Sequence, residues 1–351
     1  MTNGGKPRIA IDAMGGDVGP AVMVAGAVMS QEQIPGVDFL LFGDETAIRA
    51  ELSALGADMA RFDVVHCPEV ITGDDKPSQA IRRVKTTSMG QTVDAVKTGM
   101  AQAAISGGNT GALMAISKLA LRTMPGIDRP AIAALLPTLG ENDMVMLDLG
   151  ANTECDTRNL IQFAVMGAAY VRSVLELERP RVALLNIGTE ELKGTDAVKE
   201  AATLLRDAKY LPMEFTGYIE GDKISRGLVD VVVTDGFSGN IALKTLEGTA
   251  RFVTDLLKRA FTSSIRSKLG FLISRPATDL LRHHLDPNNH NGGVFLGLNG
   301  LVVKSHGSAN ARGVANAIQV AAKLIDHELT RKITEDLDNF RAHHKGEEVA
   351  G

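Results

Sequence analysis

The feature that most constrains this chain is a repeated alternation between short apolar, β-branched runs and longer segments with helical periodicity. Several of the short runs are almost continuously apolar, which is typical of strands buried on both faces of a parallel sheet. The alternation predicts an α/β fold with a mostly parallel sheet and helices on both faces. The strand candidates are RIAIDAM, FLLFG, DVVHC, AAISGG, AIAALLPT, MVMLDLGA, RVALLNIG, VDVVVTDG and GLVVKSHG, and helical periodicity is seen in AVMVAGAVMSQE, TAIRAELSAL, PSQAIRRV and residues 312–329.

The chain shows no internal repeat and no Pro-, Gly- or Ser-rich linker that would separate independent domains. Its 351 residues with 44% hydrophobic content can build a large core. We therefore expect one α/β domain over residues 1–345, made of two joined lobes with a cleft between them. The chain ends in the polar stretch HHKGEEVAG at 343–351, and residues 346–351 are expected to form a frayed tail.

Composition excludes several classes of protein. A net charge of −5 and an aromatic content of 4% give no reason to expect nucleic acid as a partner. The two cysteines, Cys67 and Cys155, lack CxxC spacing, so neither a disulfide framework nor a zinc site is indicated. No signal-type segment and no run of about 18 apolar residues occurs, so we expect a soluble cytoplasmic protein.

Small and polar residues follow most of the predicted strands, and ligands of open α/β sheets bind beyond the carboxyl ends of strands. In IDAMGGDVGP the glycines lack the spacing of a dinucleotide fingerprint, and the alternative is a tight turn capped by Asp17. In SGGNTGALMA, bare N–H groups at the start of a helix favour an anion, and the alternative is an ordinary Asn or Thr cap. The candidate anion-binding residues in these two loops are Asp12, Gly15, Gly16, Asp17, Gly108, Asn109 and Thr110.

Three further loops add cations and amides. IGTEELKGT lacks the order of a nucleotide P-loop, so Lys193 is either a mobile cation that closes over an anion or a solvated loop charge. TDGFSGN places Asp235 and Asn240 between a strand and a helix. GLVVKSHGSANARG ends a strand with a lysine, a histidine and small residues before a helix, and contributes Lys304, His306, Gly307 and Ser308.

Histidines gather in HHLDPNNHNGG, where His283, His284 and His290 lie near Asp286. Adjacent histidines cannot share one face of a helix or strand, and no ordered spacing such as HExxH is present. We expect a surface polar cluster, and we assign no metal.

Segment 249–285 departs from the charge of the whole chain. It carries seven basic and two acidic residues, interleaved with Phe, Leu and Ile. Such a segment predicts a helical surface that docks on an acidic protein or an anionic membrane, and the alternative is a core-packing helix pair with solvated arginines. The candidate docking residues are Lys258, Arg259, Arg266, Lys268 and Arg275.

The chemistry open to these loops needs no protein nucleophile. No G-x-S-x-G elbow and no reactive-looking cysteine occurs. Inorganic phosphate is itself a competent nucleophile at neutral pH, because it is largely dianionic. The loops would hold phosphate, aim it at an activated carbonyl and stabilise the developing oxyanion.

The six motifs IAIDAMGGDVGP, SGGNTGALMA, MLDLGANTECD, LLNIGTEELKGT, VVTDGFSGN and GLVVKSHGSA, in this order, resemble the PlsX family of bacterial phosphate acyltransferases. The resemblance runs from about Arg8 to Leu329. It implies transfer of a fatty acyl group from an acyl carrier protein thioester to inorganic phosphate, giving an acyl phosphate for phospholipid synthesis. It also implies a fold similar to isocitrate and isopropylmalate dehydrogenases and phosphotransacetylases, a homodimer, and no cofactor.

The family pattern falls on the loop residues named above and adds Asn152 as a substrate-binding residue. Among them we expect Lys193, Lys304, His306, Asn240 and Asp235 to be catalytic. The family further implies a peripheral contact at the inner face of the membrane and delivery of the product to a membrane-bound glycerol-phosphate acyltransferase. The stretch HHLDPNNHNGGVF departs from the Tyr-Gly-Gly-Ala-Pro type of sequence expected before LGLNG, so the resemblance does not describe this part of the site.

Two other functions are alternatives to this reading of the sequence. The first is an NAD- and metal-dependent dehydrogenase of the related fold, which would need clustered Asp ligands and an Arg-rich hydroxy-acid pocket. The second is a non-enzymatic scaffold that docks on membranes through segment 249–285.

Overall fold

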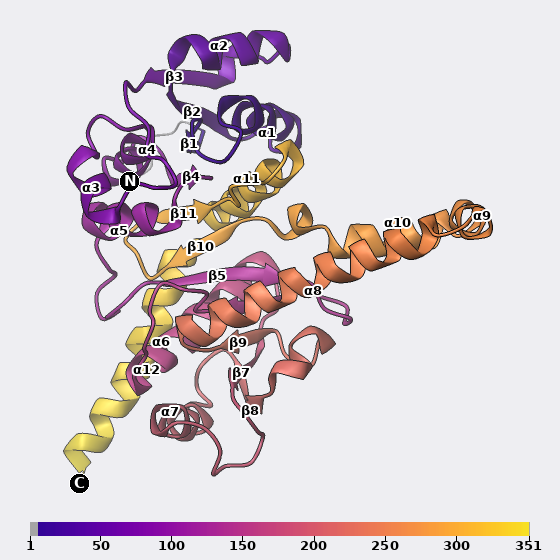
Figure 1. The fold of residues 1–351 in the computed structure, drawn as a ribbon. Coiled ribbons are helices and arrows are strands. Elements are labelled where there is room, and N and C mark those ends of the chain that lie inside the picture. The colour runs from indigo at the N-terminus through magenta and orange to yellow at the C-terminus, as the bar shows by residue number, and fades with distance from the viewer. Residues whose placement is uncertain (1–5, 351) are drawn as a thin grey trace.

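The computed structural model describes the backbone of residues 6–350 and the side chains of residues 6–343. Its strands form one 11-stranded sheet in the order β3-β2-β1-β4-β11-β10-β5-β6-β9-β7-β8, with β3 and β8 at its two ends (Figure 1). The strands are β1 (Arg8–Asp12), β2 (Asp38–Gly43), β3 (Phe62–His66), β4 (Ala103–Ser106), β5 (Ala131–Leu136), β6 (Met144–Leu147), β7 (Arg181–Leu185), β8 (Glu214–Ile219), β9 (Val231–Val233), β10 (Gly293–Leu296) and β11 (Leu301–Lys304).

The sheet is mostly parallel, as predicted, but its direction changes in the middle. Strands β3, β2, β1, β4 and β11 are parallel to one another, and so are β6, β9, β7 and β8. Between these groups β10 is antiparallel to β11 and β5, and β5 is antiparallel to β6. The carboxyl ends of the first group therefore lie at the opposite edge of the sheet from those of the second.

The predicted strands are all present, and β8 and β10 are additional to them. The helices are α1 (Pro20–Gln33), α2 (Glu45–Ala54), α3 (Pro77–Ala80), α4 (Ser88–Lys97), α5 (Thr110–Leu121), α6 (Thr157–Val174), α7 (Asp196–Asp207), α8 (Gly236–Thr262), α9 (Ile265–Ile273), α10 (Arg275–Leu285), α11 (Ala311–Asp326) and α12 (Leu329–Ala350). The helix predicted over 312–329 is α11, which continues after a turn into α12. The segment 346–350, predicted as part of a frayed tail, lies within the bounds of α12.

Both faces of the sheet are buried. Alternate residues of a strand point to opposite faces, and in β1 the side chains of Ile9 and Ile11 join one core cluster while Ala10 joins another. The same alternation separates Val302 from Val303 in β11. Burial on both faces explains why the strands read as continuous apolar runs.

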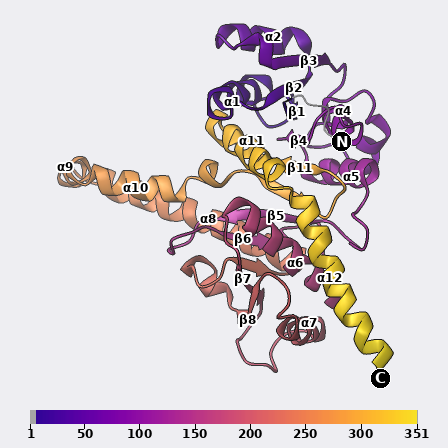
Figure 2. The same cartoon turned by 180° about the vertical axis from the view of Figure 1, so that it is seen from behind.

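Helices α8, α9 and α10 form an arm that projects from the body, as both views show (Figures 1 and 2). No residue of α9 or α10 is buried. Large apolar side chains on the arm are exposed to solvent, among them Phe252 at 66%, Ile265 at 79% and Ile273 at 83%. The arm is therefore not a core-packing helix pair. Within the described residues, no helix has the length and hydropathy needed to cross a membrane.

Candidate functional site

Three loops meet at the carboxyl ends of β1, β4 and β11, which are neighbours in the sheet. The strand register aligns Asp12 with Ser106 and Ser106 with Lys304, so three polar side chains stand at the same level of adjacent strands. We call residues 12–17, 106–110 and 304–308 the first strand-end group. It unites three motifs that lie far apart in the sequence, as the parallel-sheet rule predicts.

Asp12 is the buried carboxyl of this group, with 2% of its surface exposed. Its Oδ2 accepts a hydrogen bond of 2.7 Å from the Ser106 hydroxyl, whereas its Oδ1 has no partner among the described residues. Burial raises the pKa of Asp12 because it disfavours the charged form. Asp12 therefore has an increased tendency to stay protonated and to donate a hydrogen bond.

The glycines beside Asp12 allow the loops to approach closely. A Cβ on Gly15 would lie 2.8 Å from Asp12 Oδ2 and 3.0 Å from the backbone nitrogens of Gly107 and Gly108. The backbone N–H of Asp17 donates to Gly307 O at 2.8 Å and joins the first loop to the third. Only glycine fits at Gly15 without moving the backbone.

Lys304 supplies the cation of the first strand-end group. Its Nζ donates to Gly107 O at 3.1 Å and to Ser305 O. Burial lowers the pKa of Lys304 to about 8, although the carboxylates of Asp17 and Asp12 oppose the shift. An ammonium group has three N–H donors, so one remains for a ligand.

His306 stands at the end of the same strand, and Ser308 determines its tautomer. Its Nδ1 accepts the Ser308 backbone N–H at 3.2 Å and lies 2.9 Å from Ser308 Oγ. The ring proton of the neutral imidazole is therefore on Nε2. The side chain is accessible to solvent, yet the protein atoms around it desolvate the ring and lower the pKa of His306. His306 thus offers a neutral Nε2–H donor.

The second loop is held largely by its own cap. Asn109 accepts the Ala112 N–H at 3.0 Å as the N-cap of α5 and donates to Gly73 O and Asp75 O at 2.8 and 3.2 Å. Its side-chain amide is therefore occupied by helix capping and loop contacts, as expected for an ordinary Asn cap. Gly108 N donates to Ser106 Oγ at 3.0 Å, and Thr110 is exposed at the start of α5.

A second strand-end group, residues 148–152 and 235–240, lies after β6 and β9 at the opposite edge of the sheet. Asn152 donates to Pro130 O at 2.8 Å and to Asp148 Oδ2 at 2.9 Å. Asn240 donates to Leu149 O at 3.1 Å. Asp235 caps α8 by accepting the Ser238 N–H at 2.8 Å.

Asp148, which the sequence analysis did not single out, organises this second group. It is fully buried, and besides the Asn152 amide its carboxyl accepts backbone N–H groups at 2.7 to 3.2 Å from Ile132, Gly150, Ala151 and Asn152. Burial raises its pKa, while these hydrogen bonds oppose the shift. The signal in the sequence was an acidic residue in an otherwise apolar run, MVMLDLGA.

Helix α8 begins at the second group and carries charged residues that act on the first. Lys244, Glu247 and Arg251 on its following turns act electrostatically on His306, and Lys244 also acts on Lys304. Lys193 is exposed in the loop after β7, where its carbonyl accepts the Asn186 amide at 3.1 Å. No hydrogen bond or ion pair between described residues joins Lys193 to either group.

The histidine-rich segment is a set of separate contacts. His283 Nδ1 lies 3.3 Å from the Asn289 amide, His290 Nδ1 lies 3.0 Å from Asp143, and Asp286 pairs with Arg312. Among the residues with described side chains, no three His, Cys, Asp or Glu residues are grouped so that they could hold a metal ion.

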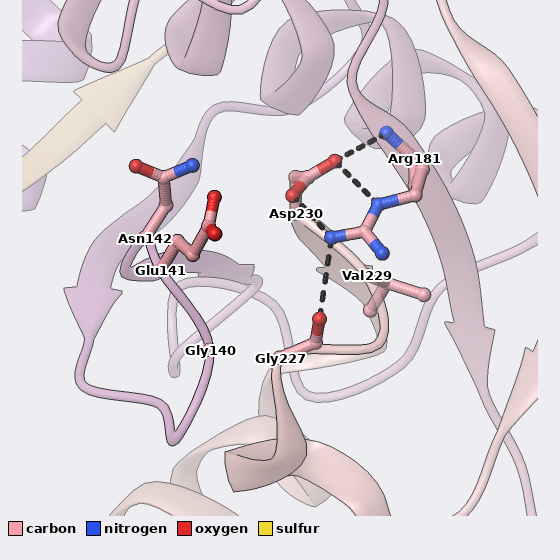
Figure 3. A pocket seen from close by; sticks show the side chains of 7 residues that line it. All are labelled: Gly140, Glu141, Asn142, Arg181, Gly227, Val229 and Asp230. Carbon is pink, nitrogen blue, oxygen red and sulfur yellow. Dashed lines mark hydrogen bonds and ion pairs between the residues drawn. The ribbon is translucent and has the colours of Figure 1, made fainter.

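A polar cavity of about 300 Å³ lies elsewhere, at the amino ends of β7 and β9 (Figure 3). Arg181 crosses it and forms a two-pronged ion pair with Asp230, at 3.0 and 2.8 Å, and a hydrogen bond with Gly227 O. Glu141 and Asn142 stand on the facing loop. None of the residues that line this cavity belongs to either strand-end group.

Comparison with known proteins gives consistent results over nearly the whole chain. The family model described as "Fatty acid synthesis protein" matches residues 7–332. A phosphate acyltransferase of Erythrobacter litoralis is 67% identical over 331 residues, which cover 94% of this chain and 93% of that protein. A phosphate acyltransferase of Rhodospirillum centenum is 52% identical over 334 residues, covering 95% and 94%.

Solved structures show the same architecture at low sequence identity. A phosphotransacetylase from Streptococcus pyogenes gives a TM-score of 0.61 at 18% identity and covers 91% of this chain and 94% of its own. The EutD phosphotransacetylase from Staphylococcus aureus gives 0.57 at 17% identity, with coverage of 91% and 94%. At these identities the likeness establishes a shared fold.

Proposed function

Because the chain belongs to the phosphate acyltransferase family, we propose that it uses the first strand-end group to bind inorganic phosphate beside a fatty acyl thioester. The enzyme transfers an acyl group to phosphate for phospholipid synthesis. The single observation that carries the proposed site is the alignment of Asp12, Ser106 and Lys304 at one level of three adjacent strands. Around it lie backbone amides of glycine-rich loops, which suit an oxyanion.

The proposed reaction is an addition to the thioester carbonyl followed by elimination of the thiolate, with phosphate as the nucleophile. A phosphate oxygen forms a bond to the carbonyl carbon, the carbonyl oxygen becomes an oxyanion, and collapse of this intermediate breaks the C–S bond. The sulfur leaves as a thiolate and is protonated by solvent. No oxidant, reductant or covalent enzyme intermediate is needed.

The side chains have complementary roles in this proposal. Lys304 offers a partly desolvated ammonium to phosphate. The raised pKa of Asp12 favours its protonated form, which can donate a hydrogen bond where a carboxylate would repel the anion. The Nε2–H of His306 polarises the thioester carbonyl or stabilises the oxyanion, as neutral donors do in other acyl transfers. Gly15, Gly16, Asp17, Gly307 and Ser308 shape the loops that enclose the phosphate.

Residues outside the first strand-end group complete the proposed site. We assign Lys193 as a mobile cation, because its loop is exposed and carries Gly194 with a positive φ of 94°. Asp235 and Asn240 lie at the start of α8, whose next turns act on His306. The Asn152 carbonyl accepts the Gly236 N–H at 2.8 Å and so supports this start of α8. Asn109, Gly108 and Thr110 are assigned to the phosphate loop, where Asn109 holds the backbone in place.

The projecting arm supports the partner part of the proposal. Lys258, Arg259, Arg266, Lys268 and Arg275 all lie on α8, α9 or α10 and are all exposed. Acyl carrier protein and the inner leaflet of the membrane are acidic, so both complement this surface. We assign the donor as an acyl carrier protein thioester, the assembly as a homodimer, and the acceptor of the product as a membrane-bound glycerol-phosphate acyltransferase.

Incubation of the purified chain with acyl carrier protein thioester and ³²P-labelled phosphate tests the proposal. The expected products are labelled acyl phosphate and free carrier thiol in equal amounts. Thiol release that does not require phosphate would contradict the assigned acceptor. Equal turnover with an acyl pantetheine at the same concentration would contradict recognition of the carrier protein while leaving the acyl transfer intact.

A further inference from the structure

We propose that Asn291, in the turn that follows α10, is a positioning residue that fixes the backbone of His306 for acyl transfer. The proposal rests on the function proposed for His306 above. Neither its sequence spacing nor the resemblance singled out Asn291. It is 7% exposed and lies between the turn Pro287–His290 and strand β10.

The Asn291 amide makes three hydrogen bonds, all to the loop that carries His306 or to the helix that follows it. Its Oδ1 accepts the backbone N–H of His306 at 2.8 Å. Its Nδ2 donates to Ser305 Oγ and to Gly313 O, each at 2.8 Å. Both N–H donors and one acceptor position of the amide are therefore used.

A second amide from the same turn holds the other end of the loop. Asn288 Oδ1 accepts the backbone N–H of Asn310 at 3.0 Å, and Asn310 is the N-cap of α11. Asn288 is itself oriented by Asp286, whose Oδ1 accepts both its backbone and side-chain N–H groups at 3.0 and 2.8 Å. The loop from Ser305 to Asn310 is thus anchored at both ends by residues 286–291.

These anchors matter for His306 because the tautomer and the protonation of its imidazole depend on the geometry of the loop. The Nδ1 acceptor contact to Ser308 N–H exists only while His306 and Ser308 keep their relative positions. A protonated ring would place a second proton on Nδ1, opposite that donor. The charged groups that act on His306 are Lys244, Glu247 and Arg251 from α8 and Lys304 from its own strand. Desolvation and the three cations favour the neutral ring, and only Glu247 opposes them.

The test compares Asn291→Leu with Gln162→Leu, a matched control. Gln162 on α6 is also a buried amide with three hydrogen bonds, to Asp128 N, Gly126 O and Asp128 Oδ2, and it lies outside the proposed site. Each variant replaces a buried, hydrogen-bonded amide by an apolar side chain, so both proteins should unfold at a lower temperature than the wild type. Only Asn291→Leu should lower kcat, by about 10- to 100-fold, as expected for a small displacement of a reacting group.

Two further readouts separate positioning from a structural role. In ¹⁵N-histidine NMR spectra, the wild type should show His306 protonated on Nε2 at pH 7, and Asn291→Leu should give mixed tautomers. The acid limb of the kcat profile should also move toward higher pH in the variant, because a looser and better solvated ring gains a proton more readily. In a His306→Ala background, Asn291→Leu should cause no additional loss of kcat.

The outcomes are distinguishable. If His306→Ala keeps full turnover, the role proposed for His306 is wrong, and the NMR spectrum still reports whether Asn291 fixes the ring. If His306→Ala is impaired but Asn291→Leu behaves like Gln162→Leu in turnover, pH profile and tautomer, the positioning role is refuted. If Asn291→Leu does not fold, Asn291→Ala is measured in the same way. The smaller side chain leaves room for water, which can hydrogen-bond to the groups that Asn291 held.

Discussion

Replacement of Lys304 by Met is expected to separate stability from activity. The folded protein lowers the pKa of Lys304 from 10.5 to about 8 because it desolvates the ammonium. At about 1.4 kcal/mol per pKa unit, keeping this charge in place costs the folded state about 3 kcal/mol near neutral pH. Methionine keeps the apolar stem and removes the charge.

Part of the stability gained by removing the buried charge is offset by lost hydrogen bonds. Nζ donates to Gly107 O and Ser305 O, and each such bond contributes about 1 kcal/mol. Lys304→Met should therefore be about 1 kcal/mol more stable than the wild type at pH 7, although it removes the cation of the proposed phosphate site. Acyl phosphate formation should fall by about 100-fold or more.

Urea unfolding at two pH values provides the measurement. The penalty is fully present below pH 8, where the lysine is charged in both the folded and the unfolded state. It fades between about pH 8 and 10.5, because the folded state releases its proton first. The advantage of Lys304→Met should therefore shrink between pH 7 and 9.5.

The exposed Lys118 on α5 provides a control, since Lys118→Met should change neither turnover nor the pH dependence of stability. A Lys304→Met protein that is several kcal/mol less stable than the wild type at pH 7, with a difference that does not vary with pH, would refute the reasoning about burial. Wild-type turnover by this variant would remove Lys304 from the mechanism.

Three more substitutions test other parts of the proposal. Lys193→Ala should abolish phosphate-dependent loss of the acyl thioester at unchanged melting temperature, and retention of full turnover would exclude Lys193 from the site. Gly15→Ala should destabilise the fold by about 1–3 kcal/mol and reduce turnover, because its Cβ would lie 2.8 Å from Asp12 Oδ2. Unchanged phosphate affinity in a calorimetric titration would contradict the assignment of this loop to phosphate binding. Charge reversal at Arg266 and Lys268 should prevent cosedimentation with anionic vesicles while turnover of a soluble short-chain acyl donor continues, and loss of that turnover would favour a role for the arm in folding or catalysis.

Local sequence signals were sufficient for most of the fold. Strands buried on both faces need apolar side chains at every position, so β1, β4 and β9 were visible as continuous runs. Polar residues at strand ends were equally visible, because Asn109, Asp235 and Asn310 cap the helices that follow. The membership of Asp12 and Lys304 in one group followed from the rule that parallel strands place their carboxyl ends together.

Two short connections in the sequence also indicate that the sheet reverses direction. The connection between β5 and β6 spans only residues 137–143, and the connection between β10 and β11 spans only residues 297–300. Parallel pairing requires a crossover of about a dozen or more residues, so both pairs had to be antiparallel. That reversal places Asp148 and Asp235 at the opposite edge of the sheet from Asp12.

By itself, the sequence determined the α/β class, the strand-end loops and their capping residues, because these depend on burial periodicity and on contacts between neighbours in the chain. Only the tertiary structure decided that Ser106 aligns with Asp12 and Lys304, that Asp148 organises the second group, and that Asn291 holds His306. These contacts join residues far apart in the chain, and the hydrogen-bond partners of a buried amide or carboxyl depend on the packing of the whole sheet. Local residue preferences do not encode them.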